Sequence, residues 1–152
     1  MAVKPIPEGY HTVTPYLTVQ GAAKLIDFLK KAFGAETVHE PHKLPDGKIM
    51  HAEVKIGDSR VMLSDATEQM PATQTSLYLY VNDVDGVYKR AIAAGGTSTI
   101  EPMDQFYGDR SGGLKDPFGN RWWVATHKED VPASELEKRF KTFIEQQKNK
   151  AA

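Results

Sequence analysis

Residues 12–34 read TVTPYLTVQGAAKLIDFLKKAFG and combine two kinds of hydrophobic periodicity. The first eight, residues 12–19, are rich in β-branched and aromatic side chains, which is typical of a strand. Pro15 cannot donate to a ladder, so it indicates an edge or a strand end. From Ala22 to Phe33 apolar residues recur at intervals of three, four and seven. This pattern predicts a helix that ends at Gly34.

The same succession returns later in the chain. Residues 76–81 predict a second strand, and residues 84–92 predict a second helix followed by two glycines. Three pairs of landmarks share one offset of 62 residues: Leu17 with Leu79, Gly34 with Gly96, and Gly57 with Gly119. The shared offset favours a duplicated strand–helix–strand–strand–strand module over two unrelated segments with common stop residues.

Further strands complete each copy. Met50, Ala52, Val54 and Ile56 alternate with polar residues, which predicts a half-buried strand, and residues 60–65 form its partner. In the second copy, residues 97–100 and 121–126 predict strands, whereas residues 104–115 are Gly-rich and weakly patterned. The predicted fold class is α+β in a single domain over residues 1–152. Module one covers 11–65, a linker covers 66–75, and module two covers 76–127.

A third helix is predicted over residues 133–149. Ser134 and Glu137 have the spacing of a capping box. One face of this helix is largely apolar and consists of Leu136, Phe140, Phe143, Ile144 and Gln147. The simplest interpretation is packing against the domain core. Contact with a second copy in a dimer is the alternative.

Composition excludes several classes of function. The chain of 152 residues has no cysteine, which excludes disulfides, thiolate metal sites and thiol nucleophiles. Its net charge of −1 argues against a nucleic-acid partner. No apolar run approaches the ~20 residues that span a bilayer, and the N-terminus has no apolar signal core. We therefore expect a cytoplasmic protein that does not contact membranes.

Several motifs resemble the vicinal oxygen chelate superfamily, which groups glyoxalases, bleomycin-resistance proteins and extradiol dioxygenases. They are the duplicated module, FGA at residues 33–35 and DPFGN at residues 116–120. Further motifs resemble the PhnB-like branch: HAE at 51–53, IGDS at 56–59, MLSD at 62–65, YGDR at 107–110 and WW at 122–123. The resemblance covers about residues 11–127. It implies two tandem βαβββ modules whose curved mixed sheets surround a cavity, in a homodimer; the C-terminal helix predicted above follows these modules.

The resemblance also places the metal ligands of the family. Metal-dependent members hold one divalent ion through four inward side chains, usually His, Gln or Glu. The corresponding positions here are Thr14, Met62, Ser76 and Trp123. Hydroxyls are weak ligands, a thioether is soft, and an indole has no usable lone pair. We therefore expect no metal, no other cofactor and no Lewis-acid catalysis.

One histidine–carboxylate pair has the spacing that places both side chains on the same face of a strand. His51 and Glu53 are two residues apart, so they share one face of a strand. They are the candidate catalytic residues, as a general acid/base pair, and also candidates for polar recognition of a ligand. The alternative is a solvated strand face that Lys55 continues.

The resemblance implies that the family ligand positions point into the cavity, and strand alternation from those positions then predicts an aromatic cavity wall. The candidate ligand-binding residues are Tyr16, His51, Glu53, Arg60, Tyr78, Tyr80, Tyr107, Arg110, Arg121 and Trp123. Tyrosine and tryptophan offer flat apolar area with a polar group, and arginine pairs with a carboxylate or stacks on a ring. Alternatively, Tyr78 and Tyr80 fill a narrow cavity without a ligand. Tyr107 and Arg110 form either a mouth over the pocket or a turn held by an Arg–Asp pair with Asp109 or Asp116.

No phosphate-binding glycine loop and no GxSxG nucleophile elbow is present in the sequence. We therefore predict a metal-free homodimer that binds a small planar or aromatic molecule without turning it over. The alternative is an enzyme of the same superfamily, a lyase, isomerase or dioxygenase. It would use His51 and Glu53, or a metal site that the sequence does not reveal. A scaffold protein that uses the tail helix is a third hypothesis.

Overall fold

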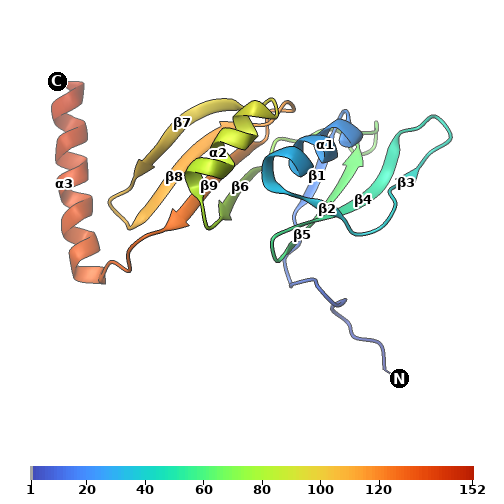
Figure 1. Ribbon diagram of the computed structural model, residues 1–152, viewed down its shortest axis with the longest axis horizontal. Coiled ribbons are helices and arrows are strands. Elements are labelled where there is room, and N and C mark those ends of the chain that lie inside the picture. Colours follow the sequence, from blue (N-terminus) through green and yellow to red (C-terminus); the bar gives the residue numbers. More distant parts are fainter. Residues whose placement is uncertain (1) are drawn as a thin grey trace.

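The computed structural model describes residues 2–152 and contains two modules side by side, followed by a third helix (Figure 1). Module one folds one mixed sheet against one helix. Its elements are β1 (Tyr16–Val19), α1 (Ala22–Phe33), β2 (Glu36–Thr37), β3 (His42–Lys43), β4 (Ile49–Ile56) and β5 (Ser59–Asp65). The strand order is β1-β5-β4-β2, with β1 parallel to β5, and β3 pairs with β4.

Module two repeats this topology. Its elements are β6 (Ser76–Tyr80), α2 (Val84–Ala93), β7 (Thr97–Asp104), β8 (Asp109–Lys115) and β9 (Arg121–His127). The order is β6-β9-β8-β7, with β6 parallel to β9 as β1 is to β5. The α+β fold with two βαβββ modules and a C-terminal helix is confirmed.

Glycines at matching turns account for the sequence repeat. Gly57 and Gly119 adopt φ values of +57° and +83° in the turns before β5 and β9, a conformation that favours glycine. Gly34 ends α1 with φ of +67°. After α2 the glycine with positive φ is Gly95 rather than Gly96.

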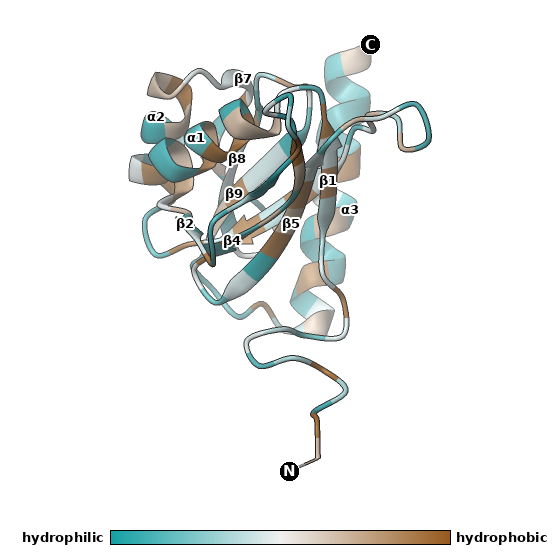
Figure 2. Cartoon of the chain, turned by 90° about the vertical axis from the view of Figure 1, so that its right-hand side faces the viewer, coloured by the Kyte–Doolittle hydropathy of each residue, from teal (hydrophilic) through white to brown (hydrophobic). Residues whose placement is uncertain are grey.

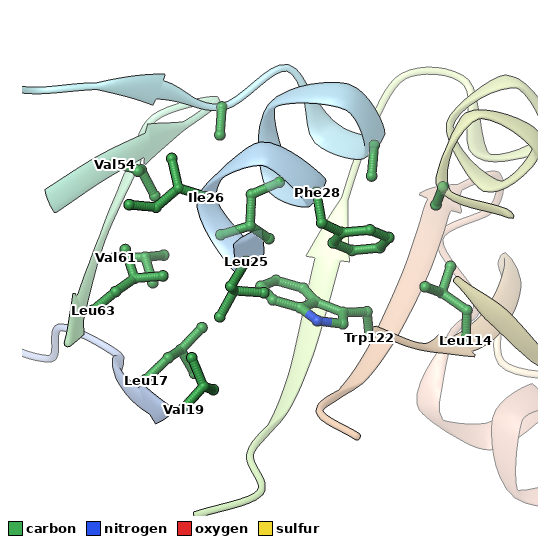
Figure 3. Packing of buried hydrophobic residues seen from close by; sticks show 14 of the residues in the cluster. Leu17, Val19, Leu25, Ile26, Phe28, Val54, Val61, Leu63, Leu114 and Trp122 are labelled. Carbon is green, nitrogen blue, oxygen red and sulfur yellow. The ribbon is translucent and has the colours of Figure 1, made fainter. Parts of the chain in front are cut away.

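The hydrophobic core lies between the helices and the sheets. Leu17 and Leu63 from module one and Trp122 from module two are fully buried. The Trp122 indole reaches toward α1 (Figure 3), where its ring centroid lies 5.0 Å from that of Phe33. Its Nε1 donates to Asp116 at 2.9 Å. The two modules therefore share one core, which α1 and α2 extend by packing against each other.

Within residues 2–152, no helix packs closely on the opposite face of either sheet, although α3 lies on that side of the strands (Figure 2). Figure 2 shows α1 and α2 together on one side of the strands. We call the other sides the open faces of modules one and two. Tyr16 on the first open face, and Tyr78 and Tyr80 on the second, are among the exposed large side chains. The edge strands β1 and β6 belong to separate sheets, so a seam without strand pairing divides the modules.

Two sequence-based strand assignments in module one are corrected. The first strand begins at Tyr16 rather than residue 12, because Pro15 supplies no N–H for pairing. In β4 the predicted alternation is wrong at its start, where Ile49 is 2% exposed and Met50 is 58% exposed. The β3–β4 ladder has a register shift between His42 and Lys43, opposite this part of β4. Such an irregularity exchanges the faces of the residues that follow.

The Gly-rich stretch 104–115 is also more regular than its sequence indicates. β7 continues to Asp104, and a full strand, β8, follows from Asp109. A Cβ on Gly112 would lie 3.1 Å from Pro102, and one on Gly113 would lie 2.7 Å from Thr99 Oγ1. Close packing between β7 and β8 thus calls for glycines, and glycines weaken the strand pattern.

Helix α3 (Ala133–Ala151) lies beyond β7, at the end of module two away from module one (Figure 1). Its N-cap is Pro132, with no side-chain capping bond, so the predicted capping box at Ser134 is wrong. Phe106 contacts Phe140 and Phe143, with ring centroids 5.9 and 5.0 Å apart. No residue of α3 is buried. The prediction that this helix packs into the core is therefore wrong. Its contact with a second copy stays a prediction.

Within residues 2–152, no helix combines the length and the apolar character that crossing a bilayer requires.

Candidate functional site

The four positions at which the family resemblance places metal ligands lie on or next to the central strands of both modules. Thr14 precedes β1, Met62 lies in β5, Ser76 opens β6, and Trp123 lies in β9. None of the four supplies an imidazole nitrogen or a carboxylate oxygen. This donor set does not fit a divalent ion.

A polar cluster occupies the open face of module one. His51 Nε2 lies 3.1 Å from Glu53 Oε1, and the Tyr16 hydroxyl lies 3.4 Å from His51 Nδ1. His39, which the sequence analysis did not select, places Nε2 3.4 Å from Glu53 Oε2. The structure thus brings together three predicted residues, Tyr16, His51 and Glu53. Both ring nitrogens of His51 therefore have a polar neighbour, the Tyr16 hydroxyl at Nδ1 and the Glu53 carboxylate at Nε2.

The charge state of this cluster follows from its burial. Burial alone raises the pKa of Glu53, but the neighbouring Tyr10 hydroxyl, His51 and His39 reverse the shift, so the pKa lies below its usual value. Burial, together with Glu53, raises the pKa of Tyr10 to about 12. The Tyr10 hydroxyl is buried, and Glu53 is its polar neighbour, although the pair falls outside ideal hydrogen-bond geometry. Near neutral pH the cluster therefore presents a carboxylate and a neutral phenol.

Arg60 borders this cluster through Tyr10 and also lies at the seam. Its guanidinium carbon is 5.5 Å from the centroid of the Tyr10 ring. A cleft of about 750 Å³ opens there, and residues of both modules line it, including Arg60, Tyr78 and Tyr80. Its apolar wall includes Phe33, Ile56, Leu77, Leu79 and Trp122. Of the ten predicted ligand-binding residues, Arg60, Tyr78 and Tyr80 share the cleft.

A second polar cluster lies on the open face of module two and centres on Asp109. The hydroxyls of Tyr78 and Tyr80 donate to Asp109 Oδ2 at 2.9 and 3.0 Å. His127 Nδ1 lies 2.8 Å from Asp109 Oδ1. Asp109 is only 4% exposed, so its charge depends on these three donors. The cluster joins β6, β8 and β9.

The second ring nitrogen of His127 also faces a carboxylate. Nε2 lies 2.8 Å from Asp130 Oδ1. Hydrogen bonds to Asp109 and then to Asp130 raise the pKa of His127, which stabilises the imidazolium. Burial opposes ionisation of Asp109, but His127, Tyr78 and Tyr80 lower its pKa below the usual value.

The two predicted arginines of module two lie outside both clusters. Arg110 points to the helix-covered side, where Nε and Nη2 donate to Asp85 of α2 at 2.9 and 3.0 Å. It also pairs with Asp104 at 3.4 Å, so its partners differ from the Asp109 or Asp116 considered above. Arg121 is exposed at the start of β9. Tyr107, in the turn between β7 and β8, lies close to Tyr78 of the Asp109 cluster and adds to the effect of burial in raising the pKa of Tyr78.

Sequence reasoning missed Asp109 and His127 as site residues. Alternation along β9 carried a signal for His127, because it has the same parity as Trp123. No comparable signal marked Asp109, since it lies in the weakly patterned stretch. The two residues meet only through the β8–β9 register, in which Asp109 is the partner of His127.

Comparison with known proteins places these observations in a family. The model of the Glyoxalase/Bleomycin resistance protein/Dioxygenase superfamily matches residues 10–124. An uncharacterized protein of Mycobacterium bovis is 37% identical over 137 residues, which is 82% of this chain and 89% of the relative.

Solved structures share the fold at lower sequence identity. TioX from Micromonospora sp. ML1 superposes with a TM-score of 0.67 at 24% identity, covering 77% of this chain and 98% of TioX. A Bacillus cereus PhnB protein, named as a putative 3-demethylubiquinone-9 3-methyltransferase, gives a TM-score of 0.62 at 19% identity. That match covers 76% of this chain and 99% of the other. At these identities the likeness shows the fold alone.

Proposed function

This chain belongs to the glyoxalase/bleomycin resistance protein/dioxygenase superfamily, and within it we propose that the chain is a metal-free protein that binds a planar or aromatic small molecule. One observation carries the proposal. The open faces present hydroxyl-bearing aromatic side chains, Tyr16, Tyr78 and Tyr80, while the four family metal positions carry no good ligand. Flat aromatic surface with a few fixed polar groups is the usual lining of small-molecule sites.

The ligand cavity in this proposal requires a second copy of the chain. Helices α1 and α2 pack together on one side, so the two open faces of one chain look to the same side and do not face each other (Figure 2). A homodimer that lays one open face on another covers the exposed tyrosines and encloses a cavity. Exposed Met50, Ile100 and Met103 support this proposal, because large apolar side chains favour burial in an interface.

Metal content and ligand binding test the proposal directly. Protein purified without chelator is analysed for divalent metals, its mass in solution is measured by light scattering, and planar aromatic compounds are titrated by tryptophan fluorescence. We expect substoichiometric metal, a dimer, and saturable quenching. A Trp123→Phe variant controls for the source of the quenched fluorescence. Trp122 is fully buried, whereas Trp123 lies on the open face. A stoichiometric transition metal, or flat titrations across the panel, would overturn the proposal.

An enzyme that uses His51 and Glu53 is the second candidate function. The 3.1 Å contact between them and the buried Tyr10 hydroxyl beside Glu53 favour it. The lowered pKa of Glu53 argues against it, because a general base works best with a pKa near the working pH. Mass spectrometry of bound compounds after long incubation separates the candidates. Unchanged ligand supports binding alone, whereas conversion that Glu53→Gln abolishes supports the enzyme.

A further inference from the structure

We infer that His127 is an oxyanion-binding residue of the module two open face, and that the ligand carries a carboxylate or a similar anionic oxygen group beside its planar ring. The inference rests on the proposed function for the ring and adds a polar recognition group that neither the motifs nor the relatives assign. Its first support is the way His127 is held. The buried Asp109 accepts from Nδ1–H at 2.8 Å, which fixes the ring and directs Nε2–H away from β8.

The present partner of Nε2 is easily displaced. Asp130 lies in the linker before α3, and its side chain is fully exposed. Exposed ion pairs contribute little net free energy, because water solvates both charges almost as well. A ligand oxyanion at this position would keep the charge-assisted hydrogen bond and release Asp130 to solvent. The Asp130 carboxylate therefore marks where an anionic ligand oxygen binds.

A second, independent observation comes from Ser111. It lies on β8 two residues after Asp109, so it shares the open face. Ser111 is 1% exposed, and its hydroxyl has no hydrogen-bond partner. Buried hydroxyls are nearly always paired, so an unpaired one beside the Asp109 cluster indicates a polar ligand atom.

Arg110, next to Asp109 in β8, and Arg139 of α3 are already engaged on other carboxylates. Arg110 makes its paired hydrogen bonds to Asp85, on the helix-covered side. Arg139 binds Glu129 at 2.8 Å and Glu135 at 3.1 Å. His127 is therefore the cationic group that the Asp109 cluster offers to a ligand.

A matched pair of probes tests the inference on the full chain. Anilinonaphthalene sulfonate and N-phenylnaphthylamine have the same aromatic skeleton, but only the first carries an anionic group. We expect His127→Gln to weaken sulfonate binding about tenfold or more, as loss of a hydrogen bond between charged groups does. The same variant should leave binding of the neutral probe within about twofold, because the aromatic wall is unchanged.

Removing the Asp130 carboxylate, which competes for His127 Nε2, should strengthen sulfonate binding rather than weaken it. Asp130→Asn should tighten binding of the sulfonate about two- to fivefold, because an exposed pair that competes for Nε2 is lost. Asp104→Asn is the matched control: it removes an exposed carboxylate at the end of β7 that contacts Arg110 rather than His127. We expect less than twofold change in the control. An equal gain in both variants would show a general charge effect and would overturn the inference.

The pH profile of the wild-type protein provides a readout that does not depend on any variant. His127 is faced by Asp109 from β8 and Asp130 from the linker, with Tyr78 and Tyr80 of β6 bound to the same Asp109. The pKa of Asp109 is lowered and the pKa values of Tyr78 and Tyr80 are raised, so none of these three groups titrates between pH 6 and 9. Sulfonate affinity should fall as the pH rises through the pKa of His127, and neutral-probe affinity should stay flat.

The outcomes separate this inference from the proposed function. If neither probe binds the wild-type protein, both fail. If the neutral probe binds and the sulfonate is no tighter, or if His127→Gln weakens both probes equally, planar-ligand binding stands and the oxyanion site is refuted. Melting temperatures of the variants check folding, and should His127→Gln not fold, Asp130→Asn and the wild-type pH profile decide.

Discussion

Replacing Asp109 with alanine should reveal how strongly the module two cluster holds its strands together. The substitution removes the acceptor of both the Tyr78 and Tyr80 hydroxyls, at 2.9 and 3.0 Å. A shielded hydrogen bond to a charged group contributes about 1.5–3 kcal/mol, but water replaces part of this at partly exposed tyrosines. We therefore expect the free energy of unfolding to fall by about 2 kcal/mol at pH 7. For a chain of this length, Tm should fall by about 4–8 °C.

A double-mutant cycle isolates the interaction from the loss of the side chain. Urea unfolding of Asp109→Ala, Tyr78→Phe and the double variant should give a coupling free energy of about 1 kcal/mol. Tyr16→Phe is the control, because Tyr16 lies in module one and contacts His51 rather than Asp109. Its combination with Asp109→Ala should be additive within about 0.3 kcal/mol. A coupling between Asp109 and Tyr78 no larger than the control value would refute this reasoning.

The pH dependence of the free energy of unfolding tests whether the Asp109 carboxylate stabilises the fold. The pKa of Asp109 is lowered in the folded protein, so its contribution is present above the unfolded value of about 3.8 and is lost as the pH falls through the folded pKa. The stability difference between wild type and Asp109→Ala should therefore shrink from pH 7 to pH 3. A difference that stays constant over this range contradicts a stabilising carboxylate.

Three further predictions concern the core, the linker and the tail. Trp122→Ala should lower the free energy of unfolding by about 3–5 kcal/mol in urea titrations, because the indole is fully buried and joins the modules at Phe33; a cost below 1 kcal/mol would contradict this role. Gly108→Ala should speed proteolysis between β9 and α3, because φ is +102° and a Cβ there would overlap the Glu129 carbonyl; an unchanged cleavage rate would speak against it. Deleting residues 133–152 should shift Tm of the dilute protein by less than about 2 °C, because α3 buries no residue; a larger fall would show that the helix supports the domain.

Most of the fold was predictable because its causes are local. The spacing of apolar residues predicted the helices of both modules, and glycines at equivalent turns revealed the repeat. The failures have non-local causes. β8 escaped detection because Gly112 and Gly113 are required by contacts with β7, which a sequence pattern does not contain. The position of α3 depended on whether its apolar face finds a partner, and periodicity alone does not identify that partner.

The site was less predictable, because side-chain partners depend on register and on the side a residue faces. His51 and Glu53 were found since their spacing alone places them together. Arg110 was assigned to the pocket, but its strand turns it toward Asp85 on α2, 25 residues away in sequence. Asp109 and His127 meet across two strands and gave no joint signal. The cytoplasmic location, the absence of a cofactor and the homodimer stay predictions.

The aromatic positions of the two modules are equivalent. Tyr16 is the strand partner of Met62, and Tyr78 is the strand partner of Trp123, so the two tyrosines occupy the same place in the repeat. Met62 and Trp123 are themselves equivalent, and both replace a ligand of metal-dependent relatives. The duplication has therefore kept an aromatic side chain on each open face at positions where the ion-binding donors are absent.

The charged positions are not equivalent, and this matters for the ligand. Glu53 pairs with Met62, whereas the residue that pairs with Trp123 is Gly113. Asp109 lies four residues before Gly113, toward the end of β8 near α3. A cavity made from the open face of one module and the open face of the other thus has an anionic group near its middle and an imidazolium toward one end. Such a cavity orients a planar ligand that has one charged end, and binds a symmetrical neutral compound in either direction.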